Sequence, residues 1–151
     1  MTPIVSTNEI VLMVHTFCDA NDIPYDAIVI GGGAGLMLRG LREQTADLNL
    51  WIDEPHFARL AEREKVICHP LVDTVFNPVG APYFWIRKRN PYFKVDEFEG
   101  LKVFDVLTYL IHKRGGLNRV ERPLAKRQQD RLDLIKLDAL FKEMHPVKTT
   151  A

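Results

Sequence analysis

Apolar residues in the first half of the chain are spaced as in helices in some segments and as in strands in others. After the capping-box sequence that begins at Ser6, they recur three and four residues apart, as on one face of a helix. Strict alternation over 47–53 places Leu48, Leu50 and Ile52 on one face of a strand. The pattern predicts helices over 6–20, 36–41 and 55–65, and strands over 27–30, 47–53, 66–68 and 71–76.

Turn and capping residues divide the second half of the chain into shorter elements. Glu99-Gly100 separates two strand-like runs and indicates the turn of a hairpin. Asp105 can cap a helix that Gly115-Gly116 stops. We expect strands over 84–87, 93–98 and 101–104, a helix over 105–113, and a last helix from Pro123 whose buried stripe comprises Leu132, Ile135, Leu137, Leu140, Phe141 and Met144.

The order of these elements predicts a fold class. Some strands follow one another directly and others are separated by helices, which indicates a mixed β-sheet flanked by helices, with a C-terminal helix. We therefore expect an α+β fold with α/β-like features. With 151 residues, the chain is predicted to form one domain over 1–145, followed by a flexible tail over 146–151.

The composition of the chain indicates where the protein is located and shows that its charges are unevenly distributed. No secretory signal and no apolar run of about 20 residues is recognised, so we expect a cytoplasmic protein without membrane association. Cys18 and Cys68 lie in apolar surroundings without a C-x-x-C partner and are predicted to be buried, reduced thiols. Residues 1–75 contain 11 acids and 5 bases, and residues 76–151 contain 9 acids and 15 bases. An acidic half suits cations and a basic half suits phosphate.

A glycine-rich turn after the strand at 27–30 is the strongest candidate for phosphate binding. A P-loop is excluded because Leu41 and Arg42 stand where it requires Lys and then Ser or Thr. A dinucleotide fingerprint lacks its third glycine at Leu36, although Asp53 follows at the expected spacing, so this class stays a weak alternative. The run can also be a tight connection without a ligand.

A third interpretation depends on residues in a fixed order: Gly31-Gly32-Gly33-Ala34, Gly40-Leu41-Arg42, Thr45 and Asp47-Leu48-Asn49. They resemble the nucleotidyltransferase superfamily that includes DNA polymerase beta, especially its small antitoxin-like and abortive-infection type E members. Gly100-Leu101-Lys102-Val103, Lys113 and the stretch 127–133 are similar to its later motifs. The resemblance spans residues 26–140, nearly the whole chain.

The resemblance implies a metal-dependent transfer reaction. A hydroxyl on protein or RNA would attack the α-phosphate of a nucleoside triphosphate, releasing pyrophosphate, with two Mg²⁺ or Mn²⁺ ions. The implied metal-binding and catalytic residues are Asp47, Asn49 and Asp73, and the implied phosphate-binding residues are Gly31, Gly32, Arg42, Thr45, Lys113 and Arg127. A toxin-antitoxin or phage-defence partner is implied as well. Sequence readout of DNA is not expected.

Asn49 is the main departure from the family pattern, which has a second, metal-bridging Asp at this position. An amide supplies one neutral oxygen where a carboxylate supplies two charged ones, so metal affinity should fall. The site can therefore be a weak enzyme, or a catalytically degenerate protein that binds a nucleotide or a partner. Asp73 can also be an acid exposed on an edge strand, and Asp96 is a rival third carboxylate.

Basic and aromatic residues mix around 84–94, which suits a nucleic-acid strand or an ordinary solvated hairpin. The bases from Lys113 to Arg131 can contact phosphate, or form a network of Asp130 with Arg127 or Asp133 with Arg131.

The five histidines are scattered, which indicates no metal centre, and the single Ser6 excludes serine nucleophile chemistry.

Overall fold

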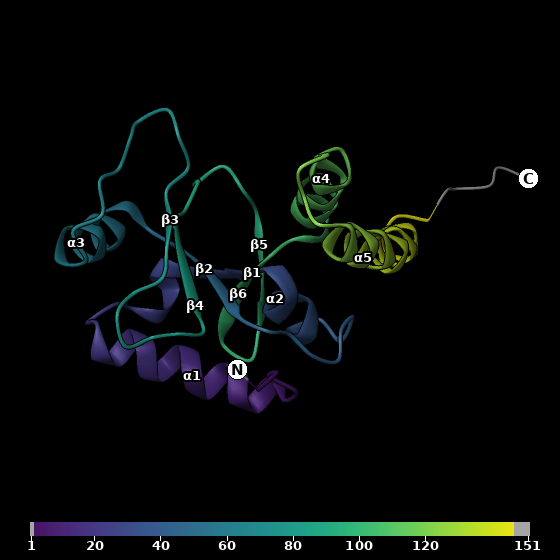
Figure 1. Ribbon diagram of the computed structural model, residues 1–151. Helices are drawn as coiled ribbons and strands as arrows, with labels where there is room; N and C mark the ends of the chain where they lie inside the picture. The colour runs from purple at the N-terminus through teal and green to yellow at the C-terminus, as the bar shows by residue number, and fades with distance from the viewer. Residues whose placement is uncertain (1, 147–151) are drawn as a thin grey trace, which may run out of the picture. The chain divides into compact units, whose positions relative to one another are not determined.

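The computed structural model describes residues 2–146 and divides into two compact units, one ending at Phe104 and one beginning at Asp105. The single domain expected over 1–145 therefore consists of two parts. Of the tail expected over 146–151, all but Pro146 lies outside the described residues. The first unit contains α1 (Thr7–Ala20), a 3₁₀ turn (Tyr25–Ala27), β1 (Ile28–Gly31), α2 (Gly32–Leu38), β2 (Leu48–Ile52), α3 (Glu54–Arg63), β3 (Val75–Phe76), β4 (Phe84–Lys88), β5 (Val95–Phe98) and β6 (Leu101–Phe104) (Figure 1).

The first unit is built on a six-stranded mixed sheet with the strand order β3-β4-β2-β1-β6-β5. β1 and β2 are antiparallel, whereas β1 pairs with β6, and β2 with β4, in parallel. Together with the flanking helices, this sheet confirms the predicted α+β fold. The two central strands, β1 and β2, place the end of the glycine-containing strand beside the start of the Asp-x-Asn strand.

Alternation along the strands separates a covered face of the sheet from a more open one. Leu48, Leu50 and Ile52 are fully buried, and the intervening Asn49 and Trp51 are only half-buried, as the alternating pattern predicts. α1 covers the buried face, where Phe17 stacks on Phe84 of β4 with ring centroids 4.5 Å apart (Figure 1). The side chains of Asn49 and Trp51 therefore emerge on the open face.

Local capping and turn chemistry were predicted correctly at three positions. The hydroxyl of Ser6 accepts a hydrogen bond from the amide of Glu9 and caps α1. Asp105 caps the first helix of the second unit by accepting from the amide of Thr108. Glu99 and Gly100 both have positive φ, as a two-residue hairpin turn requires, and connect β5 to β6.

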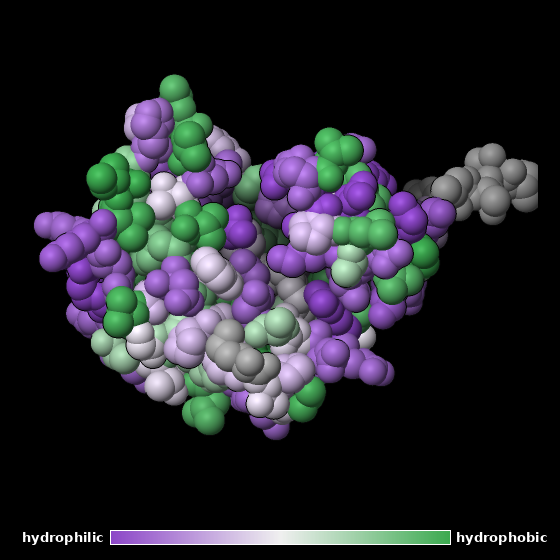
Figure 2. Space-filling view, viewed as in Figure 1, coloured by the Kyte–Doolittle hydropathy of each residue, from purple (hydrophilic) through white to green (hydrophobic). Residues whose placement is uncertain are grey.

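The expected strands over 66–68 and 71–76 are wrong except for β3 itself. Residues 66–74 form an irregular connection in which Ile67, Leu71 and Val72 are exposed, as is Cys68, which was predicted to be buried. Hydrophobic residues are visible on the surface of the molecule over this connection (Figure 2). Pro70 has no amide hydrogen to donate to a neighbouring strand. The segment has the composition of a strand, but Ile67, Leu71 and Val72 are not buried against a sheet.

Helix boundaries differ from the expectation around the glycines. α2 begins at Gly32 rather than at residue 36. Glycine can adopt the turn that leads from β1 directly into the helix. In the second unit, α4 (Val106–Leu117) continues through Gly115 and Gly116 instead of stopping before them. It is followed by α5 (Leu124–Met144). Glycine in a helix costs about 1 kcal/mol relative to alanine, which packing against a neighbouring helix can offset.

The predicted buried stripe of α5 is largely wrong. Leu132, Ile135 and Met144 are more than half exposed, whereas Leu134 and Leu137 are buried. The buried face of α5 also contains Asp130 and Asp133, which interact with α4. Because two charged residues belong to the buried face, apolar periodicity alone selects the wrong side of this helix.

Within residues 2–146, no helix combines the length and apolar character needed to cross a bilayer.

Candidate functional site

The glycine turn and the Asp-x-Asn strand lie in direct contact in the first unit. Gly31, the last residue of β1, is paired with Asn49 of β2 in the antiparallel register. Gly32 has φ +57°, and a Cβ at this position would lie 2.9 Å from the amide nitrogen of Asn49. A larger residue would therefore suffer both backbone strain and a clash with Asn49. The glycine is required for the close approach of the two segments.

Gly33 faces two of the predicted phosphate-binding residues, Thr45 and Arg42. A Cβ at Gly33 would lie 2.5 Å from the hydroxyl oxygen of Thr45 and 2.6 Å from a terminal guanidinium nitrogen of Arg42. Thr45 is buried and donates a hydrogen bond to the carbonyl oxygen of Asp47 at 3.1 Å. The segment from Arg42 to Asp47 therefore folds back over the glycines.

Asp47 and Asn49 complete this arrangement. The side-chain amide of Asn49 donates to the carboxylate of Asp47 at 3.3 Å, as expected for residues two apart on one face of a strand. A second carboxylate at position 49 would repel Asp47, whereas the amide supplies a neutral donor. We call Gly31, Gly32, Gly33, Arg42, Thr45, Asp47 and Asn49 the glycine-turn site.

Asp73 does not belong to the glycine-turn site. It is exposed, lies in no strand, and precedes Val75, which pairs with Arg87. Arg87 pairs in turn with Trp51, near the end of β2, whereas Asp47 precedes the beginning of that strand. The register therefore directs Asp73 toward the opposite end of the sheet from Asp47, roughly 15–20 Å away by strand rise. The structure therefore does not bring Asp73 to the glycine-turn site, where a third carboxylate was expected.

The rival acid, Asp96, has a different partner. Its carboxylate forms an ion pair with Arg39 at 2.5 Å, and Arg39 also donates to the carbonyl oxygen of Phe104 at 2.6 Å. The side chain of Arg39 is only 4% exposed. Arg39 therefore connects the end of α2 to the β5–β6 hairpin. This clamp was not predicted, because residues 57 positions apart leave no local signal in the sequence.

The glycine-turn site offers few ligands for a metal ion. Asp47 contributes one carboxylate, a hard ligand suited to Mg²⁺, whereas Asn49 directs its amide nitrogen, a hydrogen-bond donor, toward that carboxylate at 3.3 Å. Among residues 2–146, no group of three or more His, Cys, Asp or Glu side chains could hold a metal ion. This donor set does not fit a two-ion centre. It fits a single ion whose remaining ligands are phosphate oxygens and water.

An aromatic cluster supports the glycine turn from the open face of the sheet. The ring of Trp51 packs edge-to-face on Phe104 at 4.9 Å and occupies the space that a side chain at Gly31 would need. The guanidinium of Arg87 lies over the Trp51 ring, 5.1 Å from its centroid. Phe93 also packs edge-to-face with Phe104, with ring centroids 5.8 Å apart. Gly31 is thus required for packing as well as for the turn.

Lys113 and Arg127, the other predicted phosphate ligands, belong to the second unit. Lys113 forms ion pairs with Asp130 at 3.0 Å and Asp133 at 2.9 Å, and both acids are buried. Arg122 forms a further pair with Asp130 at 2.7 Å. Arg127 lies half-buried near the start of α5. We call Lys113, Arg122, Asp130 and Asp133 the buried ion cluster.

The buried ion cluster corrects the network expected from the sequence. Asp130 and Asp133 point toward α4, so their basic partners are Lys113 on that helix and Arg122 before α5, and not Arg127 or Arg131. Gln129 donates to Asp133 at 2.8 Å from the preceding turn. Arg122 was the member that sequence reasoning missed, since it lies outside both helices. Lys113 has two carboxylate partners of its own and is less available to a phosphate.

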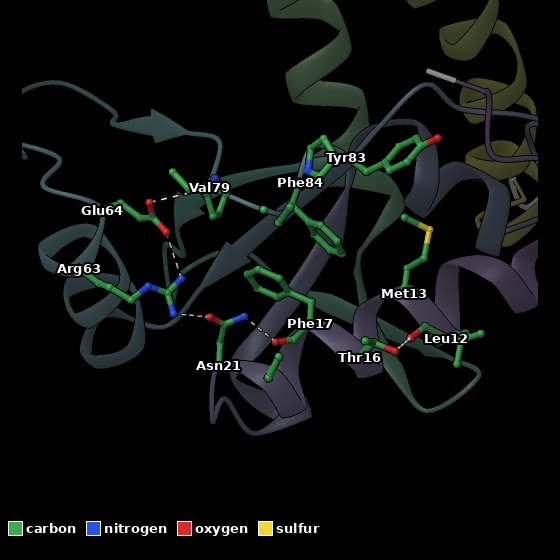
Figure 3. Close-up of a pocket in the computed structure, with 15 residues that line it drawn as sticks. Leu12, Met13, Thr16, Phe17, Asn21, Arg63, Glu64, Val79, Tyr83 and Phe84 are labelled. Atoms are coloured by element: carbon green, nitrogen blue, oxygen red, sulfur yellow. Dashed lines mark hydrogen bonds and ion pairs between the residues drawn. The ribbon is translucent and has the colours of Figure 1, made fainter.

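A separate apolar cavity lies on the covered side of the sheet. It has a volume of about 610 Å³ and is lined by α1, the end of α3 and the loop 78–83 (Figure 3). Phe17 and Phe84 point into it, while Arg63 is directed to Asn21 and Glu64 to Val79 at its edge (Figure 3). None of the residues of the glycine-turn site lines this cavity.

Comparison of the chain with protein-family models, curated proteins and solved structures found no significant match. The nucleotidyltransferase resemblance therefore depends on the motif residues alone, and the function that follows is inferred from the site.

Proposed function

We propose that this protein is a nucleotidyltransferase-like protein that binds a nucleoside triphosphate at the glycine-turn site and is degenerate as a catalyst. The observation that carries the proposal is the contact between Gly32 and Asn49, with Asp47 hydrogen-bonded beside them. Backbone free of side chains suits close approach by phosphate, and Arg42 supplies a positive charge next to it. Asp47 would hold a Mg²⁺ or Mn²⁺ ion carried by the triphosphate.

Binding is better supported than turnover because the site has one carboxylate. Nucleotidyl transfer of the type implied by the resemblance uses two ions, which stabilise both the attacking and the leaving oxygen. Asn49 removes one negative charge, and Asp73 lies toward the other end of the sheet. A protein that binds nucleotide without efficient transfer fits an interaction role, such as that of a toxin-antitoxin or phage-defence partner.

Active transfer of a nucleoside monophosphate to a hydroxyl on protein or RNA is the second candidate. It is favoured by one observation: Arg42 and Thr45 lie against Gly33, and Thr45 donates a hydrogen bond to the backbone carbonyl oxygen of Asp47. In that reaction the acceptor oxygen bonds to the α-phosphorus as the bond to pyrophosphate breaks. Asp47 would hold the ion that binds the triphosphate, and Arg42 would orient the phosphates.

Two measurements on the same variants separate these candidates. Equilibrium binding of each labelled nucleoside triphosphate is measured with Mg²⁺ or Mn²⁺, and label transfer is then followed after adding cellular RNA or protein. Asp47→Ala should weaken binding, whereas the exposed Asp73→Ala should leave it unchanged. Binding without transfer supports the degenerate protein, and transfer that Asp47→Ala abolishes supports the enzyme. Absence of both binding and transfer in the wild type contradicts both candidates.

A further inference from the structure

Trp85 lies next to the glycine-turn site on the open face of the sheet. It is the second residue of β4 and is paired with Asn49 in the parallel register between β2 and β4. Its neighbours Phe84 and Ile86 are buried on the covered face, so alternation places the indole on the same face as Asn49. The pairing of Trp51 with Arg87, two residues further along, produces a contact between their side chains and confirms this orientation.

The two tryptophans on this face have different surroundings. The ring of Trp51 is packed between Phe104, Arg87 and the backbone of Gly31. Trp85 is 40% exposed, and within the described part of the chain its side chain has no ring contact, ion pair or hydrogen bond. The face of its indole is therefore available to a ligand.

Hydrogen bonds in the preceding loop fix the backbone next to Trp85. The side-chain amide of Asn77 donates to the carbonyl oxygens of Ala81, Pro82 and Phe84, at 3.1, 3.3 and 2.7 Å. These hydrogen bonds close the loop between β3 and β4 and fix the residue immediately before Trp85. An aromatic side chain on a fixed backbone loses little freedom when a ligand stacks on it.

Spacing across the sheet matches the dimensions of a nucleotide. Gly31, Asn49 and Trp85 stand side by side on β1, β2 and β4, so two strand spacings, about 10 Å, separate Gly31 from Trp85. A nucleotide whose phosphates lie at the glycine turn is long enough for its base to reach Trp85. Base stacking on an aromatic side chain is a common mode of nucleotide recognition and tolerates all four bases.

We propose that Trp85 is the surface on which the base of the bound nucleoside triphosphate stacks. This inference rests on the proposed function, because it assigns a role within the same site. It predicts a division of binding energy in which the glycine turn and Asp47 recognise the phosphates and Trp85 recognises the base. Discrimination between bases should be weak, since every base presents an aromatic face.

The test compares ligands with and without a base. Affinities of full-length wild type, Trp85→Ala and Trp85→Phe are measured calorimetrically for each nucleoside triphosphate and for inorganic triphosphate, all with Mg²⁺. Trp85→Ala should weaken nucleotide binding roughly ten-fold or more and leave inorganic triphosphate unchanged. Trp85→Phe should recover part of the loss. Tyr92→Ala is the matched control, because Tyr92 is an aromatic residue, 89% exposed, beyond the other end of β4.

Each outcome decides a different question. Equal losses for nucleotide and inorganic triphosphate in Trp85→Ala would mean that Trp85 only supports the fold, which overturns the inference. Unchanged nucleotide affinity in Trp85→Ala also overturns it, while the proposed function stands. If the wild type binds neither ligand, the proposed function fails, and the inference fails with it. Weakened binding only of ligands that contain a base supports both.

Discussion

Three consecutive glycines in this protein make three different contacts. Gly31 leaves space for the ring of Trp51, Gly32 adopts a positive φ beside Asn49, and Gly33 lies against Thr45 and Arg42. Each contact excludes a Cβ for its own reason. The run is therefore a packing requirement of the site as well as a turn, and substitutions in it should affect stability together with ligand binding.

Gly33→Ala should destabilise the protein. The added Cβ would lie 2.5 Å from the hydroxyl of the buried Thr45, and overpacking of this kind costs about 1–3 kcal/mol. Gly115→Ala is the matched control, since no atom lies within 4 Å of its Cβ position and alanine favours a helix by up to about 1 kcal/mol. Urea unfolding measures both. Equal stability of Gly33→Ala and wild type would mean that Thr45 and Arg42 do not pack on the glycine.

Cys18 should make stability fall in alkaline solution. Burial, and secondarily the charge of Asp19, raises the pKa of the Cys18 thiol from 9.0 to about 12. Between these values the unfolded chain loses the thiol proton and the folded chain keeps it, so this contribution to folding is complete below pH 9 and is lost above it. Relative to Cys18→Val, wild type should lose stability from pH 8 to 10.5 in thermal unfolding. A constant difference would contradict a buried neutral thiol.

At the scale of elements, the sequence is informative where local chemistry decides the structure. The cap at Ser6, the hairpin turn at Glu99 and the alternation along β2 all depend on residues close together in the chain, and all three are found. The predicted stripe of α5 is largely wrong, although Leu137 is buried, because the buried face of the helix contains Asp130 and Asp133. Their partner Lys113 lies on another helix, which no periodicity within α5 reveals.

The buried ion cluster should dominate the stability of the α4–α5 pair. Lys113→Met would leave two buried carboxylates without their shared partner, and breaking a buried pair in this way costs about 3–5 kcal/mol. The adjacent Arg114 pairs with Asp138 at 3.1 Å on the exposed surface, so Arg114→Met should cost less than about 1 kcal/mol. Unfolding followed by helical circular dichroism would compare them. Similar losses for the two variants would show that burial does not determine the contribution of these pairs.

At the scale of the whole molecule, the contacts that form the site join distant parts of the sequence. The parallel pairing of Ile30 with Val103 and of Asn49 with Trp85 creates the sheet, and neither pairing has a local signal. The proximity of Asp47 to the glycine turn could be predicted from the sequence, because one short segment of the chain connects the two. Asp73 was predicted to join the site because the residues around it have the composition of a strand, whereas they form an irregular loop. The position of Asp73 depends on the register of β3 on β4, which has no local signal.

The charge distribution follows the boundary between the two units. Residues 1–104 contain 14 acids and 10 bases, a net charge of −4, and residues 105–151 contain 6 acids and 10 bases, a net charge of +4. The acidic surplus therefore belongs to the unit that contains Asp47. A single divalent ion carried by a triphosphate is compatible with that unit, and under the proposed function the one carboxylate of the glycine-turn site would limit the strength of its binding.

Calorimetric titration of Mn²⁺ into wild type and Asn49→Asp tests most directly whether positions 47 and 49 form a metal-binding pair. A second carboxylate beside Asp47 should lower stability without metal, through like-charge repulsion, and should tighten Mn²⁺ binding. Wild type should bind Mn²⁺ weakly, and Asn49→Asp more tightly, with thermal stability regained on adding the metal. Unchanged affinity in Asn49→Asp would contradict the assignment of position 49 as a ligand position and, with it, the proposed nucleotidyltransferase-like site.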